Sequence, residues 1–316
     1  MLFSSLLIFG GLILLFFGGE GLVRGASSLA LRLGLTPLVV GLTVVAFGTS
    51  APELVVSLKA NLAGLGDVAI GNVVGSNIFN IGMILGITAL IYPIKVQLQI
   101  LRWDAPLMLG ISGVLVFFLW DQRISQLEGG LLFAGILAYT VSAVVIAKKE
   151  TLSAEVTAEF SESVVPPKHS SWLDALYIAG GLVLLILGSR WLVEGATAIA
   201  KSFGVSDAII GLTIVSAGTS MPELSACLVA AFRKQPDIAI GNIIGSNIFN
   251  ALAIVGISGL VKPISSPGIG FVDMGVMLVF SACLLPLMWS GFCLRRWEGG
   301  VLMLGYVGYI VWLWPK

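Results

Sequence analysis

Charged side chains are scarce in this sequence. They make up 11% of its 316 residues, against about 25% in an ordinary soluble domain. Basic and acidic residues number 17 each, so the formal net charge is zero. A chain without excess positive charge has no basic surface for a polyanion, which excludes nucleic acid as an expected partner. The scarcity of charge indicates a chain that lies largely in apolar surroundings.

Histidine and cysteine, which supply most zinc sites and many catalytic nucleophiles, are also rare. His169 is the only histidine, and it lies in a polar stretch. Cys227, Cys283 and Cys293 lie in apolar runs without metal-like spacing, so we interpret them as small core residues. No serine, histidine and aspartate set has catalytic spacing. We therefore expect neither an enzyme nor a bound cofactor.

Long apolar runs are what the chain has instead. Hydrophobic residues make up 57% of it, and runs near the roughly 20 residues of a bilayer-spanning helix recur throughout. Residues 148–170 form the only long polar stretch, which we interpret as a solvated linker. The sequence predicts an all-α integral membrane protein with ten transmembrane helices. Their expected positions are 2–32, 36–62, 67–93, 104–121, 125–147, 171–202, 206–232, 237–262, 272–292 and 297–314.

The two halves of the chain repeat one another. A shift of 170 residues aligns Gly41–Gly82 with Gly211–Leu252 without a gap, and 23 of these 42 positions are identical. We therefore expect residues 1–147 and 171–316 to form one five-helix unit each. Because five is odd, two such units in series enter the membrane from opposite sides. This predicts two inverted five-helix repeats with a binding site near the midplane, as in many secondary carriers.

Basic residues in the loops indicate the orientation. With the amino terminus outside, the cytoplasmic side holds ten lysine and arginine residues and the opposite side holds five. We therefore expect a multi-pass protein of the inner (plasma) membrane, with both termini outside and the 148–170 linker in the cytoplasm.

A six-residue motif with a central proline and a terminal glutamate appears once in each half. It reads GTSAPE at Gly48–Glu53 and GTSMPE at Gly218–Glu223, in both cases deep inside an apolar segment. A carboxylate placed there costs about 2.5–3.5 kcal/mol on insertion scales, so such residues normally face a bundle interior and serve a function. Glu53 and Glu223 are therefore candidate functional residues.

The proline of this motif predicts a broken helix. Pro52 lacks a backbone donor and clashes with the carbonyl four residues earlier, so Gly48 and Pro52 together should interrupt the helix near Thr49. Freed carbonyls, hydroxyls and a carboxylate are hard oxygen ligands that suit Ca²⁺ or Na⁺. A kinked helix whose glutamate is simply bonded to a neighbour is the alternative interpretation.

A second motif, GN-x-x-GSNIFN, begins at Gly71 and again at Gly241. Its glycines, four residues apart, let helices approach closely. Ser76 and Asn80 share one helix face, as do Ser246 and Asn250, and they could present oxygens to the same ions. Hydrogen bonding between helices is the alternative for these four. It is the preferred interpretation for the remaining asparagines, which are Asn72, Asn77, Asn242 and Asn247.

Other charges in the apolar segments are expected to be structural. Asp67 and Asp237 begin predicted helices and are interpreted as caps. Glu20 and Arg24 align with Arg190 and Glu194, so the signs are exchanged between the halves. We interpret these as neutralised pairs within each helix, or as pairs exchanged between the two helices.

The doubled motifs resemble the alpha repeats of the cation/Ca²⁺ exchanger superfamily, and most closely those of prokaryotic sodium/calcium exchangers. The resemblance implies ten helices, with spans 2, 3, 7 and 8 around four cation sites and spans 1 and 6 sliding as a gating pair. It implies that Glu53 and Glu223 bind Ca²⁺ with the carbonyls of Thr49 and Thr219, and that Asn80 and Asn250 complete the central layer. Sodium sites would draw on Ala46, Ser50, Ser76, Ser216, Ser220 and Ser246.

The chain departs from the superfamily pattern at two positions. Some relatives carry aspartate at the position of Asn250, and asparagine here argues against potassium coupling. Ser216 replaces the alanine found at Ala46 in the other half, a change of small consequence if this position acts through its carbonyl.

The predicted function is secondary active exchange of Na⁺ for Ca²⁺ by alternating access. A Ca²⁺/H⁺ or other divalent cation antiporter of the same superfamily is the main alternative, and a channel or an intramembrane enzyme fits the symmetric motifs less well. The expected partners are Ca²⁺ and Na⁺ as substrates and the lipid bilayer. A monomer is the working expectation for the oligomeric state.

Overall fold

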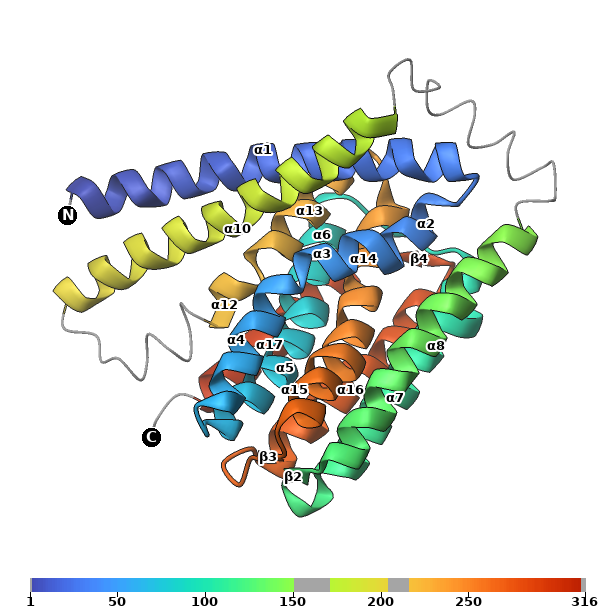
Figure 1. The fold of residues 1–316 in the computed structure, drawn as a ribbon. Helices are drawn as coiled ribbons and strands as arrows, with labels where there is room; N and C mark the ends of the chain where they lie inside the picture. Colours follow the sequence, from blue (N-terminus) through green and yellow to red (C-terminus); the bar gives the residue numbers. More distant parts are fainter. Residues whose placement is uncertain (1, 151–170, 204–215, 314–316) are drawn as a thin grey trace.

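The computed structural model describes residues 2–150, 171–203 and 216–313. In these ranges the chain is almost entirely helical (Figure 1). The helices of the first half are α1 (Leu2–Leu33), α2 (Pro37–Val40), η1 (Gly41–Val45), α3 (Ala46–Thr49), α4 (Ala51–Leu62), α5 (Gly66–Phe79), η2 (Asn80–Leu85), α6 (Gly86–Ile91), η3 (Ile100–Asp104), α7 (Ala105–Phe118), η4 (Leu119–Asp121) and α8 (Gln126–Glu150).

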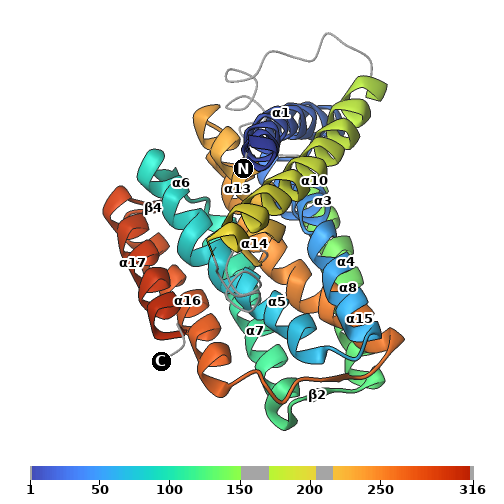
Figure 2. The same ribbon diagram turned by 90° about the vertical axis from the view of Figure 1, so that its left-hand side faces the viewer.

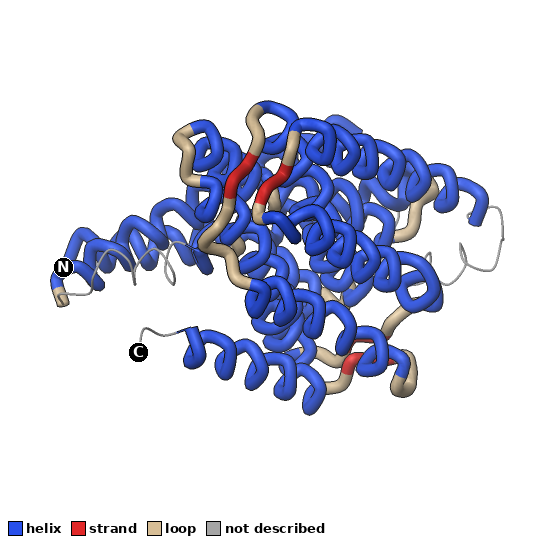
Figure 3. The backbone as a smooth tube through the Cα atoms, turned by 90° about the horizontal axis from the view of Figure 1, so that it is seen from below, coloured by secondary structure: helices blue, strands red, loops and turns tan. Residues whose placement is uncertain are grey.

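The second half follows the same order. Its helices are α10 (Ser171–Ser202), α12 (Ser216–Thr219), α13 (Met221–Phe232), α14 (Pro236–Phe249), η6 (Asn250–Ile254), α15 (Val255–Val261), α16 (Phe271–Trp289) and α17 (Arg296–Leu313). Two-residue strands connect the halves: β1 (Ile94–Lys95) pairs antiparallel with β4 (Cys293–Leu294), and β2 (Arg123–Ile124) pairs antiparallel with β3 (Ile264–Ser265) (Figure 3).

Six of the described helices are long and apolar enough to cross a membrane, and the broken pair Pro37–Thr49 and Ala51–Leu62 would make a seventh. These seven coincide with predicted spans. The count of ten remains a prediction, because α8 and α17 do not meet the same criteria and residues 204–215 lie outside the described ranges. Helix α8 also continues through Glu150, so the helix extends three residues into the predicted linker, whose remainder lies outside the described residues.

Helices α1 and α10 form a closely packed pair that lies across the other helices (Figures 1 and 2). Glycines in both helices allow the close approach. A Cβ atom on Gly11 would lie 2.7 Å from the carbonyl oxygen of Gly188, and one on Gly18 would lie 2.9 Å from that of Gly181. Because the numbers rise along α1 as they fall along α10, the two helices run antiparallel.

The charged pairs of α1 and α10 only partly follow the sequence interpretation. Arg190 and Glu194 form the predicted pair within α10, at 2.7 Å. Glu20, however, pairs with Arg233 at the end of α13, with Arg233 Nε donating to its carboxylate at 2.7 Å. Arg24 instead lies 5.0 Å from the centre of the Tyr177 ring of α10. Helix α1 is thus tied by charge to α13 in the second half.

We expect the Glu20–Arg233 ion pair to help hold α1 against α13. Glu20→Lys places two positive charges together, and the melting temperature of the purified protein should fall. The double variant Glu20→Arg with Arg233→Glu should recover most of the loss. Because partly exposed ion pairs contribute only about 0.2–1 kcal/mol, the shift should be small. Glu194→Lys, which disturbs a pair confined to α10, is the matched control, and an equal fall in both single variants would refute the α1–α13 tie.

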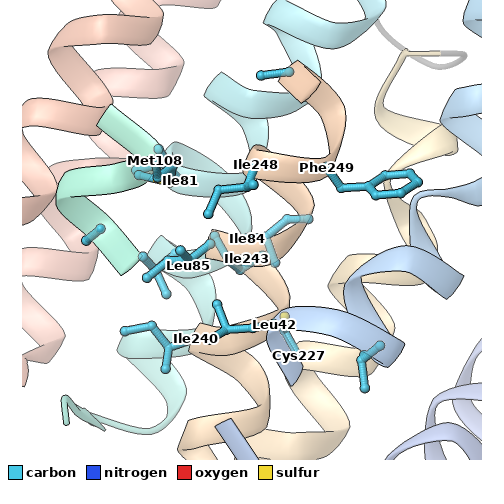
Figure 4. Packing of buried hydrophobic residues seen from close by; sticks show 14 of the residues in the cluster. Leu42, Ile81, Ile84, Leu85, Met108, Cys227, Ile240, Ile243, Ile248 and Phe249 are labelled. Carbon is cyan, nitrogen blue, oxygen red and sulfur yellow. The ribbon is translucent and has the colours of Figure 1, made fainter. Parts of the chain in front are cut away.

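Helices α5 and α14, which carry the second motif, lie at the centre of the fold. In the helical stretch Pro236–Val261, which begins with α14, every residue of the most apolar segment is buried. In the corresponding stretch Gly66–Ile91, which begins with α5, 72% of the residues of that segment are buried. Figure 4 shows how α14 packs against η2 and its neighbours, with labelled side chains Leu42, Ile81, Ile84, Leu85, Met108, Cys227, Ile240, Ile243, Ile248 and Phe249. The repeated GN-x-x-GSNIFN motif is therefore the most enclosed part of the described chain.

The predicted capping role of Asp67 is not what the structure shows. The N-cap of α5 is Leu65, without a side-chain hydrogen bond, and Asp67 lies in the first turn. Its Oδ1 accepts a hydrogen bond from the backbone N–H of Gly268 at 2.8 Å, which holds the loop before α16. Asp237 similarly lies in the first turn of α14, whose N-cap is Gln235.

Candidate functional site

Both six-residue motifs break their helices where the prolines predict. Helix α3 ends at Thr49 and α4 begins at Ala51, with a bend of 45° between the pieces. Ser50 at the break has φ −84° and ψ 4°, and the equivalent Ser220 has φ −92° and ψ 8°. The near-identical dihedrals show that the same local chemistry produces the same break in each half.

The two glutamates are buried and each is bonded to the other half of the chain. Ser50 Oγ donates to Glu223 Oε1 at 2.9 Å, and Ser220 Oγ donates to Glu53 Oε1 at 3.1 Å. Both glutamate residues are 1% exposed. The helix breaks therefore enclose both carboxylates and place each beside the serine hydroxyl of the opposite break.

The threonines before the breaks also bond across the halves. Thr49 Oγ1 donates to Asn242 Oδ1 at 3.1 Å, and Thr219 Oγ1 donates to Asn72 Oδ1 at 3.4 Å. These two asparagines, assigned a structural role from the sequence, hold the broken helices to α14 and α5. A side-chain bond between helices is what that assignment predicted.

Asn80 and Asn250 lie where α5 and α14 change into the π-helical segments η2 and η6. Asn80 Nδ2 donates to Asn247 Oδ1 and Asn250 Nδ2 donates to Asn77 Oδ1, both at 3.0 Å. Single π-helical turns within α-helices are frequent at functional sites. Both amides are buried, so the nitrogen end of each is occupied and the oxygen end is not.

Within the described residues, four buried oxygens of the site have no hydrogen-bond partner: Glu53 Oε2, Glu223 Oε2, Asn80 Oδ1 and Asn250 Oδ1. An unsatisfied buried acceptor costs about 1–3 kcal/mol, and more when it is charged. The four oxygens form two pairs of equivalent positions, one member of each pair from each half. The misplacement of a single side chain therefore does not explain them. Carboxylate and amide oxygens of this kind are ligands for hard cations.

The described residues contain no cluster of three or more histidine, cysteine, aspartate or glutamate side chains that could hold a transition metal. The arrangement is suited to a cation held by oxygens and released again, because its charge is confined to two carboxylates.

The remaining predicted site residues lie around these groups. Ser76 is joined to Ser220 by a hydrogen bond of 3.3 Å, and Ser246 Oγ donates to Asn242 Oδ1 at 3.4 Å. Ala46 is buried at the start of α3, where it faces Gly245 of α14. Ser216 begins α12, and its side chain lies outside the described part.

Sequence reasoning missed the side chains that support Asn72 and Asn242. Asn72 Nδ2 donates to Ser57 Oγ at 3.0 Å, and Asn242 Nδ2 donates to Cys227 Sγ at 3.4 Å. Cys227, interpreted as a small core residue, is therefore also a hydrogen-bond acceptor. The sequence does contain a pattern that could have predicted these two partners. Ser57 and Cys227 occupy equivalent positions of the repeat, four residues after each glutamate and on the same helix face.

A second missed residue is Ser189 of α10. Its Oγ donates to the backbone carbonyl of Gly218 at 2.5 Å. Pro222, four residues further along, has no N–H for that carbonyl, so the serine replaces a helical hydrogen bond. The aligned position in the first half is Gly19, which has no side chain. The two halves thus differ in how α1 and α10 contact the helix breaks.

Comparison with known proteins agrees with this geometry. Residues 3–145 and 173–314 match the family described as "Sodium/calcium exchanger protein". The sodium/calcium exchanger MaX1 of Methanosarcina acetivorans is 35% identical over 98% of this chain and 97% of its own length. The inner membrane protein YrbG of Escherichia coli is 36% identical over 99% and 96%. A solved structure of the sodium-calcium exchanger NCX_Mj, soaked with Na⁺ and Sr²⁺, superposes with a TM-score of 0.84 at 29% identity and covers 98% of both chains.

Proposed function

Because the chain belongs to the sodium/calcium exchanger protein family, we propose that it exchanges Na⁺ for Ca²⁺ across a membrane by alternating access. Membership makes it an antiporter of this superfamily and not an enzyme. The observation that carries the choice of cations is the group of four unsatisfied buried oxygens around Glu53 and Glu223. The names of MaX1 and NCX_Mj support the choice of sodium as the coupled ion.

Within this proposal, Ca²⁺ is bound by Glu53 and Glu223, by the backbone carbonyls of Thr49 and Thr219, and by the central layer of Asn80 and Asn250. Sodium ions use the positions around this layer, which are Ala46, Ser50, Ser76, Ser216, Ser220 and Ser246. The support is the burial of the carboxylates and the hydroxyls already bonded to them, Ser50 to Glu223 and Ser220 to Glu53. These ions are substrates, and no resident cofactor is proposed.

Charge balance couples the two ions in the proposed mechanism. The two carboxylates carry a charge of −2, which one Ca²⁺ or two or more Na⁺ neutralise. An unneutralised pair of carboxylates in a low-dielectric site is costly, so the empty protein should resist the change between inward and outward access. The protein then changes access only when loaded, and each ion's movement depends on the other.

The proposed architecture is ten spans in two inverted five-helix repeats. The antiparallel α1–α10 pair and the reciprocal bonds between the broken helices support it, since each of these contacts from one half is matched by the equivalent contact from the other half. We further propose an inner-membrane location with both termini outside and a cytoplasmic linker. The basic residues of the loops and the name of the YrbG relative support this placement. We also propose a monomer, because the two glutamates and the serine hydroxyls bonded to them are all supplied by the two halves of one chain.

The test is uptake of ⁴⁵Ca²⁺ into proteoliposomes that contain the purified protein. An outward Na⁺ gradient should drive uptake, and equal Na⁺ on both sides should abolish it. An imposed K⁺ gradient or proton gradient of the same size should have no effect. Uptake driven by protons and indifferent to sodium would refute the proposal in favour of Ca²⁺/H⁺ exchange.

A further inference from the structure

We propose that Asn77 and Asn247 are positioning residues that hold the amides of Asn250 and Asn80 with their oxygens toward the cation site. The inference rests on the proposed function in one respect, that these two oxygens meet a cation. A side-chain amide has two ends of nearly equal shape, of which only the oxygen can bind a cation. Something must therefore fix which end faces the site.

The backbone carbonyls of Asn77 and Asn247 can only accept hydrogen bonds. Asn77 Nδ2 donates to the backbone oxygen of Asn247, and Asn247 Nδ2 donates to the backbone oxygen of Asn77, both at 3.4 Å. The nitrogen of each amide must therefore point at the opposite helix. The oxygen of each amide is then turned the other way.

The side-chain oxygens of Asn77 and Asn247 in turn determine how the amides of Asn250 and Asn80 are oriented. Asn77 Oδ1 faces Asn250 and Asn247 Oδ1 faces Asn80, each across 3.0 Å. Since an oxygen cannot donate, Asn250 and Asn80 must present nitrogen at these contacts. The oxygens of Asn250 and Asn80 are consequently directed away from Asn77 and Asn247, and within the described residues these two oxygens have no hydrogen-bond partner.

The surroundings of the four amides discourage any reversal. All four side chains are 1% exposed. The amide nitrogens of Asn77 and Asn247 also each donate to a methionine sulfur, Met277 Sδ at 3.8 Å and Met108 Sδ at 3.6 Å. A reversed amide would place oxygen against a carbonyl oxygen or lose its bond in a buried place. Each half of the chain thus sets the ligand orientation of the other half.

The experiment is a double-mutant cycle between Asn77 and Asn250. Asn77→Leu removes the acceptor that holds Asn250 and should weaken apparent cation affinity by roughly tenfold, as loss of a group that orients a metal ligand typically does. Asn250→Asp presents oxygen at both ends, so orientation no longer matters. In the Asn250→Asp background, Asn77→Leu should therefore cause no further loss of affinity. The mirror cycle uses Asn247→Leu and Asn80→Asp.

Affinity is measured as the rise in melting temperature of the detergent-purified protein during separate titrations with Ca²⁺ and with Na⁺. Asn61→Leu is the matched control, because Asn61 is equally buried and donates to the backbone oxygens of Ser258 and Lys262 outside the site. It should lower the melting temperature without cations and leave the affinity unchanged. Asn77→Ala replaces Asn77→Leu if the leucine variant does not fold.

An equal loss of affinity in both backgrounds would mean that Asn77 has only a structural role, and it would overturn the inference. Unchanged affinity in the single variant would overturn it as well. The titration does not depend on transport, so a protein that binds cations but does not exchange Na⁺ for Ca²⁺ refutes the proposed function and leaves this inference standing. If neither cation shifts the melting temperature of the unaltered protein, both fail.

Discussion

Replacing either buried glutamate by glutamine is expected to abolish sodium-driven Ca²⁺ uptake. Glutamine keeps an oxygen that can accept from Ser220 or Ser50, so the broken helices should retain their contacts. What is lost is one of two charges. Removing one partner from a buried charge pairing costs about 3–5 kcal/mol, and this corresponds to a loss of affinity of roughly 100-fold or more.

The measurement is ⁴⁵Ca²⁺ uptake into proteoliposomes with Glu53→Gln and Glu223→Gln, each reconstituted in equal amount. Glu128→Gln is the control, because that carboxylate caps α8 by accepting from the backbone and hydroxyl of Ser125 and lies outside the site. Glutamine can accept both bonds, so uptake should be unaffected. Sodium-driven uptake that persists in Glu53→Gln would show that this glutamate does not hold the ion.

Substituting Gly245 by leucine is expected to prevent the fold from assembling. A Cβ atom at Gly245 would collide with the carbonyl oxygen of Leu42 and lie 2.8 Å from Cβ of Ala46. Both neighbours belong to the helix that leads into the break, so α14 could no longer pack against it. Since the nearest obstacle is backbone, the cost should exceed the about 1–3 kcal/mol typical of overpacking in a core.

The matched control is Gly110→Leu in α7, where a Cβ atom would meet nothing within 4 Å. At that exposed position leucine should be neutral or stabilising, because glycine within a helix costs about 1 kcal/mol relative to good helix formers. Size-exclusion profile and melting temperature after detergent extraction report the outcome. A folded, active Gly245→Leu protein would mean that α14 and the helix before the break are not packed as closely as described.

Several features of the site could be predicted from the sequence because their causes are local. The scarcity of charge and the length of the apolar runs indicate that the chain lies in a lipid bilayer. Pro52 and Pro222 remove a backbone donor wherever they stand, so the interruptions at Ser50 and Ser220 follow from covalent structure. The repeat alignment made Glu53 and Glu223 equivalent without any reference to distance.

Other interpretations were wrong or incomplete because their partners are remote. Glu20 was expected to pair with Arg24 four residues away or with α10, yet it pairs with Arg233 of α13. Asp67 was expected to cap its helix, yet it binds the loop at Gly268. Helical spacing reports which residues share a face, but it does not report which charged group another segment brings to that face.

The sequence by itself determined that this chain is a helical membrane protein with two copies of one proline- and glutamate-containing motif, because hydropathy, proline chemistry and repetition are carried by neighbouring residues. Only the tertiary structure decided that Ser50 bonds to Glu223 and Ser220 to Glu53, across 173 and 167 residues. It also decided which end of each asparagine amide is left free. These choices depend on how α5 and α14 pack against each other, since a hydrogen bond requires both partners within about 3 Å. The candidate ligands can therefore be named from the motif, whereas their hydrogen-bond partners come from the opposite half of the chain.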